Sequence, residues 1–99
     1  MTDEIQASHI LVATDGKSKE DALTAITEIK EKIDGGESFA DLARAHSDCP
    51  SGGSGGDLGP FGRGMMVPEF EQAAFALETG KVSDVVETNF GFHLIQRTA

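Results

Sequence analysis

The sequence predicts an α+β domain with an antiparallel sheet, and three observations support this. Along the chain, the expected elements are a strand, two helices, a glycine-rich segment, a third helix and a final pair of strands, an order typical of α+β proteins. A tight turn separates the final strands, which therefore form an antiparallel hairpin. Ninety-nine residues support one hydrophobic core, so we expect a single domain over 1–99, with residues 1–4 disordered.

The first strand is expected over residues 5–12, where apolar and β-branched side chains gather toward the end. A turn follows at Asp15 and Gly16. Ser18 and Asp21 resemble a capping box with Asp in place of Glu, and they predict the start of a helix. Gly35 ends this helix. Its apolar residues at helical spacing are Ala22, Ala25, Ile26, Ile29 and Ile33.

A second, shorter helix is expected to begin at Ser38, with Asp41 at the capping position. Its apolar stripe consists of Phe39, Leu42 and Ala43. From residue 47 to residue 64 the pattern changes, because glycine and proline become too frequent for a helix or a regular strand. We therefore expect this segment to be a loop.

Pro68 suits the first turn of a third helix, which Gly80 closes. The apolar residues of this helix are Phe70, Ala73, Ala74 and Leu77. The end of the chain is typical of a β-hairpin, with strands over 82–88 and 91–97 and a tight turn around Asn89.

The charge balance argues against two classes of partner. Seventeen acidic and eight basic residues give a net charge of −9, which repels nucleic acids and anionic membranes. No apolar run approaches the roughly 20 residues that span a bilayer, and the acidic residues 1–4 are unlike a secretory signal. The single cysteine, Cys49, excludes an internal disulfide, so we expect a cytoplasmic protein.

Two histidines, His9 and His93, fall within predicted strands among apolar neighbours. They could be two core histidines with satisfied ring nitrogens. If their strands pair as neighbours, they could instead share a site. A metal site formed by His9, Asp48, Cys49 and His93 is conceivable, but local spacings typical of metal ligands are missing around them, so we expect no metal and no other cofactor.

Cys49 also has alternative interpretations. It could be a buried small apolar residue, or the nucleophile of a Cys–His hydrolase. A hydrolase needs an orienting third residue and an oxyanion hole, and nothing in the sequence marks either. The apolar side chains near the glycine-rich segment could pack that segment against the core, or could line a pocket for a proline ring. They are Leu58, Phe61, Met65, Met66, Val67 and Phe70.

Ordered motifs along almost the whole chain resemble the parvulin rotamases. These motifs are SHILV at 8–12, FADLA at 39–43, SDCPS at 47–51, GDLGPF at 56–61, GMMVPEF at 64–70 and GFHLI at 91–95. The resemblance implies a four-stranded antiparallel sheet surrounded by four helices, the fourth being short and lying in the glycine-rich segment. It also implies peptidyl-prolyl cis/trans isomerase activity on X-Pro bonds by a non-covalent mechanism.

Site residues follow from the same resemblance, position by position. The residues implied to be catalytic are His9, Cys49, Thr88 and His93. Those implied to contact the substrate are Leu58, Met66 and Phe70, with Phe61 supporting them and Phe90 coating one wall. The implied partners are proline-containing peptides and unfolded or folding proteins, and we expect a monomer.

The loop over residues 13–19 departs from the phospho-specific members of the family, because it carries only Lys17 and Lys19 in place of a basic cluster. We therefore expect no requirement for phosphate before proline. The alternative to an enzyme is a chaperone module that binds proline-containing peptides with little turnover, since both functions need apolar recognition.

Overall fold

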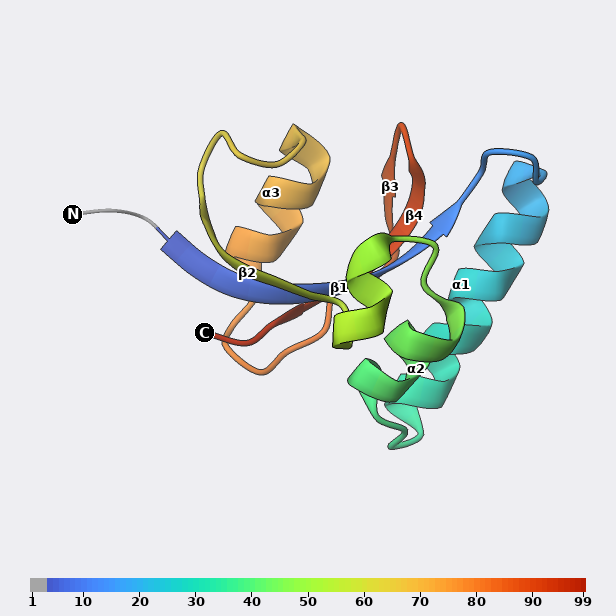
Figure 1. The fold of residues 1–99 in the computed structure, drawn as a ribbon, viewed down its shortest axis with the longest axis horizontal. Helices are drawn as coiled ribbons and strands as arrows, with labels where there is room; N and C mark the ends of the chain where they lie inside the picture. Colours follow the sequence, from blue (N-terminus) through green and yellow to red (C-terminus); the bar gives the residue numbers. More distant parts are fainter. Residues whose placement is uncertain (1–3) are drawn as a thin grey trace.

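In the computed structural model, which describes residues 4–99, the chain forms one four-stranded antiparallel sheet in the order β2-β1-β4-β3 (Figure 1). The strands are β1 (Glu4–Ala13), β2 (Asp57–Gly62), β3 (Val86–Thr88) and β4 (Gly91–Arg97). β1 and β4 pair from Ala7 opposite Arg97 to Ala13 opposite Gly91. The predicted histidine-bearing strands are therefore the central neighbours of the sheet.

Three α-helices and one 3-10 helix accompany the sheet, as the resemblance implied. They are α1 (Lys19–Asp34), α2 (Phe39–His46), the 3-10 helix η1 (Pro50–Ser54) and α3 (Pro68–Ala76). The predicted starts of α1 and α2 are confirmed. The Ser18 hydroxyl accepts a hydrogen bond from Asp21 N at 3.1 Å, and the Ser38 hydroxyl accepts one from Asp41 N at 3.3 Å, so each serine satisfies one otherwise unpaired amide.

The core consists of two apolar clusters on opposite faces of the sheet, because successive side chains of a strand alternate in direction. Ile10 and Val12 of β1 pack with α1 and α2 on one face. Ile5 and Ala7 pack with Phe61 and α3 on the other. Figure 1 shows α3 and the α1–α2 pair at different ends of β1. The face of β1 that α3 covers also carries His9, which begins the candidate site.

The glycine-rich segment is not the loop that local composition predicted, since it contains both η1 and β2. β2 pairs with β1 at Ile5 opposite Phe61 and at Gln6 opposite Pro60. Pro60 is tolerated because β2 is an edge strand, where a missing amide hydrogen breaks no ladder. Phe61 is only 1% exposed, and its burial anchors the strand.

β3 is shorter than the strand predicted over 82–88. Only Val86–Thr88 joins the ladder, and Val82 forms a single bridge with Gln96. Between them the buried Ser83 binds β4 with both its backbone and its side chain. Ser83 N donates to Ile95 O at 2.8 Å, and the Ser83 hydroxyl accepts from Ile95 N at 3.1 Å.

Residues 1–4 were expected to be disordered. Of these, residues 1–3 lie outside the described residues, and Glu4 is the first residue of β1. Among residues 4–99, no helix combines the length and the apolar character needed to cross a membrane.

Candidate active site

His9 and His93 form the floor of the candidate site. His93 lies opposite Leu11 and His9 lies opposite Ile95 in the β1–β4 ladder, so both rings project from the same face. Their Nδ1 atoms are 3.1 Å apart, and the rings stack with centroids 5.3 Å apart and planes 18° apart. The shared site that the strand positions suggested is thus present as a direct ring-to-ring hydrogen bond.

Thr88 extends this contact into a network. Its Oγ1 lies 2.7 Å from His93 Nε2 and accepts a hydrogen bond from Phe90 N at 3.2 Å. The network therefore runs from the β3–β4 turn through both rings to His9 Nε2, which is buried and has no hydrogen-bond partner among the described residues. Burying a ring nitrogen without a hydrogen-bond partner costs free energy of desolvation, so this exception calls for an explanation.

Both rings are neutral at neutral pH. Burial lowers the pKa of His9 from 6.5 to about 4. Burial, and secondarily the neighbouring His9, lower the pKa of His93 to about 4. One proton then occupies the Nδ1–Nδ1 contact, and there are two arrangements. In the first, Thr88 donates to His93 and His93 donates to His9, which leaves His9 Nε2 protonated. In the second, His9 donates to His93 and His93 donates to Thr88, which leaves His9 Nε2 unprotonated.

Phe70 of α3 covers both histidines. Its ring meets each imidazole edge-on, with a centroid distance of 5.5 Å and an interplanar angle of 81° in both cases. Phe61 lies behind Phe70 at a ring-centroid distance of 6.2 Å. Edge-to-face contacts orient aromatic rings specifically, so Phe70 and the two imidazoles fix one another's positions, while the Phe61 ring, tilted by 57°, supports Phe70 from behind.

A largely apolar cavity of about 520 Å³ lies above this floor. Its lining residues are His9, Leu11, Asp48, Cys49, Pro50, Leu58, Met65, Met66, Val67, Phe70, Phe90 and His93. The predicted residues are thus brought together, with two exceptions. Thr88 acts behind His93, and Phe61 does not line the cavity because it is buried beneath Phe70. A proline ring is small enough for such a cavity.

Three lining residues were missed from the sequence, namely Leu11, Asp48 and Pro50. Leu11 lies two residues after His9 on the same strand face, so alternation along β1 could have identified it. Pro50 starts η1, and its position depends on how the segment after α2 folds back over β1. No local pattern in the sequence reports that path.

Cys49 lies half-buried in the cavity wall. Its sulfur accepts a hydrogen bond from the Ser51 hydroxyl at 3.2 Å, and no histidine of residues 4–99 is within hydrogen-bond distance of it. The Cys–His pairing that a hydrolase requires is therefore missing from the described residues. The same residues contain no group of three or more His, Cys, Asp and Glu side chains that could hold a metal ion.

Comparisons with known proteins agree with this geometry. The family model for the PPIC-type PPIase domain, described as a rotamase, matches residues 9–99. Over 98% of both chains, the sequence is 38% identical to peptidyl-prolyl cis-trans isomerase Pin1 of Digitalis lanata. It is 52% identical to the foldase protein PrsA of a Geobacillus strain, over 96% of this chain and 32% of that protein.

A solved structure is similar over its whole length. The solution structure of NmPin, the parvulin of Nitrosopumilus maritimus, superposes with a TM-score of 0.77 at 41% identity, covering 100% of this chain and 99% of that one.

Proposed function

Because the chain belongs to the PPIC-type PPIase family and is a peptidyl-prolyl cis/trans isomerase, we propose that its substrates are X-Pro bonds of peptides and of unfolded or folding proteins. The isomerisation takes place in the cavity above His9 and His93. The observation that carries this proposal is an apolar cavity whose floor is a neutral, mutually hydrogen-bonded histidine pair. The similarity to PrsA, a foldase, and to SurA, a chaperone, supports a role in protein folding. The chain spans only 32% and 22% of those two relatives.

The physics of the reaction explains why an apolar cavity suffices. Rotation about X-Pro must break amide resonance, at a barrier of about 18–20 kcal/mol. In the twisted amide the carbonyl dipole is smaller and the nitrogen regains a lone pair. Walls such as Leu58, Met66 and Phe70 stabilise this less polar state relative to the planar forms, and the enzyme accelerates rotation to the extent of that difference.

The polar groups act in a non-covalent mechanism. The Cys49 sulfur accepts a hydrogen bond from the Ser51 hydroxyl, which leaves its own S–H free to donate weakly toward the twisted prolyl nitrogen or the rotating carbonyl. His9 Nε2 is buried, so we assign to the histidine pair the role of setting the polarity of the floor. Thr88 holds this pair in one orientation by its bond to His93.

Phosphate before proline is not required for substrate binding in this proposal. Lys19 Nζ forms an ion pair with Glu87 Oε2 at 2.6 Å. Arg63 Nη1 lies 3.8 Å from Glu71 Oε2, and the Arg63 guanidinium lies over the Phe75 ring, 4.4 Å from its centroid. Lys17 is then the one cation of the 13–19 loop without an ion-pair partner among residues 4–99. A dianionic phosphate is normally held by several basic groups, and Phe90 offers it an apolar wall instead.

We further propose a monomer that works in the cytoplasm. Three large apolar side chains are exposed among the described residues, namely Leu23, Met65 and Phe90. Met65 and Phe90 lie at the cavity, which leaves Leu23 alone on α1, too little for a stable dimer interface. The free Cys49 thiol suits a reducing compartment. Sedimentation velocity and cell fractionation test these two points.

The test of function is exchange NMR on short X-Pro peptides with catalytic amounts of the protein. Cross-peaks between cis and trans signals that appear only with protein establish turnover by this chain, and a panel of X residues that includes phosphoserine reports preference. Shifted or broadened peptide signals without exchange cross-peaks would instead favour the chaperone module that binds without turnover.

A further inference from the structure

The outer edge of β1 loses its partner strand close to the active site. β1 pairs with β2 up to Ser8 opposite Asp57, and His9 N donates to Gly56 O at 2.9 Å just beyond. From there to the end of β1, the backbone groups that point away from β4 belong to Leu11 and Ala13. A buried or half-buried strand edge needs other partners for these groups.

Two residues after α2 supply those partners, and we call them the Ser47–Asp48 clamp. Leu11 N donates to the Ser47 hydroxyl at 3.1 Å, Asp48 N donates to Leu11 O at 2.7 Å, and Ala13 N donates to Asp48 Oδ2 at 2.9 Å. Three hydrogen bonds thus tie a non-strand segment to the strand that carries His9. Ser47 and Leu11 are 36 positions apart in the chain.

The clamp is directly coupled to Cys49. The Ser47 hydroxyl oxygen accepts a second hydrogen bond, from Cys49 N at 3.3 Å, so one oxygen joins the backbone of β1 to that of Cys49. Asp48 is the residue before Cys49. The position of the thiol above the histidine floor therefore depends on the clamp as well as on its own bond to Ser51.

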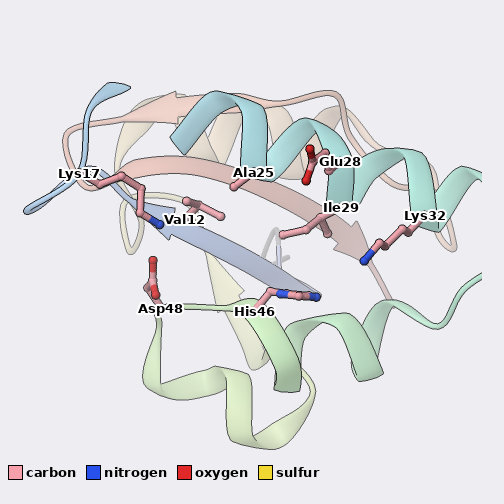
Figure 2. Close-up of a pocket in the computed structure, with 8 residues that line it drawn as sticks. All are labelled: Val12, Lys17, Ala25, Glu28, Ile29, Lys32, His46 and Asp48. Atoms are coloured by element: carbon pink, nitrogen blue, oxygen red, sulfur yellow. The ribbon is translucent and has the colours of Figure 1, made fainter. Parts of the chain in front are cut away.

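Asp48 also borders two cavities. Besides lining the active site, it lines a second cavity of about 170 Å³. Figure 2 shows its carboxylate directed from the segment after α2 toward the end of β1, near Val12 and Lys17. The other residues lining the second cavity are Ala25, Glu28, Ile29, Lys32 and His46. Its two lysines are balanced by two carboxylates, so its charge favours no particular ligand.

We propose that Ser47 and Asp48 are positioning residues for the isomerisation, because they hold Cys49 in place above His9 and His93. The proposal rests on the role of Cys49 in the proposed function. Asp48 is exposed, so water can replace it as the partner of Ala13 N at small cost in stability. What water cannot replace is the fixed geometry of the next residue, on which transition-state contacts depend.

The first test compares Asp48→Ala with Asp48→Asn. Asparagine keeps a side-chain oxygen that can accept from Ala13 N, whereas alanine does not. We expect kcat/KM to fall about tenfold in Asp48→Ala, mainly through kcat, and to stay within about twofold of wild type in Asp48→Asn. Asp41→Ala is the matched control, since it removes an exposed carboxylate that bonds only Arg44 among the described residues. An equal loss in the Ala and Asn variants would contradict the proposal.

The second test is a double-mutant cycle with Cys49→Ala, with urea unfolding measured on every variant. If Asp48 acts through Cys49, then Asp48→Ala costs no further activity once the thiol is gone. The same fold-loss in both backgrounds overturns the proposal. So does wild-type turnover in Cys49→Ala alone, and in that case the isomerase activity itself still stands.

Discussion

The two floor histidines should make both stability and turnover sensitive to acid. Their pKa values of about 4 lie below the usual 6.5, so the unfolded chain binds more protons between these limits. Their contribution to stability is complete above about pH 6.5 and is lost as the pH falls toward 4. We expect kcat/KM to stay flat from about pH 8 to 6 and to fall below about pH 5, because once both rings are charged each Nδ1 is a donor and the Nδ1–Nδ1 contact has no acceptor.

NMR titration of the imidazole signals, run beside urea unfolding at each pH, checks this prediction. Ring signals of His9 and His93 that titrate near pH 6.5, or a stability that does not change between pH 6.5 and 4, would contradict the assignment of two neutral rings.

Substitution of Phe90 should change substrate specificity while leaving stability almost unchanged. It lines the cavity but is 61% exposed, so Phe90→Ser should change the free energy of unfolding by about 0.5 kcal/mol or less. We expect KM to rise several-fold for peptides with a large apolar residue before proline, and to change little for X = Ala, because only the larger residue contacts the Phe90 ring. Leu23→Ser, which also removes an exposed apolar side chain, should change neither KM. An equal rise in KM for every X would show that Phe90 contacts the proline ring itself.

At the scale of elements, the glycine-rich segment shows why β2 was missed. Propensity counts Gly and Pro against a strand, but β2 exists because Phe61 buries its ring beneath α3 and because β1 offers an open edge. The starts of α1 and α2 were predictable because Ser18 and Ser38 act on amides three residues away. A contact between neighbours in sequence is visible in the sequence, whereas a strand that exists through its partner is not.

Gly56 and Gly59 allow two reasons for a glycine in this segment to be distinguished, a positive φ and the close approach of other atoms. Both have positive φ, at 85° and 69°, but a Cβ on Gly56 would lie 2.3 Å from His9 O while one on Gly59 would meet nothing within 4 Å. We expect Gly59→Ala to cost about 1 kcal/mol for its backbone conformation alone. Gly56→Ala should cost more than about 3 kcal/mol and should lower activity, because it pushes β2 away from the backbone of His9. Urea unfolding of the two variants checks this, and equal costs would mean that the segment relaxes freely.

At the scale of the whole molecule, the candidate site was predictable only as far as strand alternation and the family motifs reach. His9 and His93 could be expected on neighbouring strands, and Cys49, Leu58, Met66 and Phe70 around them. The Nδ1–Nδ1 bond, the edge-on packing of Phe70 and the Ser47–Asp48 clamp could not, because each depends on how segments far apart in sequence meet.

The net charge of −9 should affect which peptides reach the cavity. Within residues 4–99, ion pairs engage four of the eight basic residues, Lys19, Lys30, Arg44 and Arg63, and Asp48 lies in the cavity wall. A negative field of this kind attracts cationic ligands over a Debye length, which shrinks from about 30 Å at 0.01 M salt to about 10 Å at 0.1 M. We therefore expect kcat/KM for X-Pro peptides flanked by lysine to exceed that of uncharged peptides several-fold at low salt.

Exchange NMR across a salt series measures this ratio, with glutamate-flanked peptides as the matched control. The advantage of lysine should shrink as salt is added, and the glutamate peptides should show the opposite trend, because screening removes repulsion as readily as attraction. A lysine preference that survives high salt would place its origin in a direct contact, and the carboxylate in the cavity wall would be the first group to test, through Asp48→Asn.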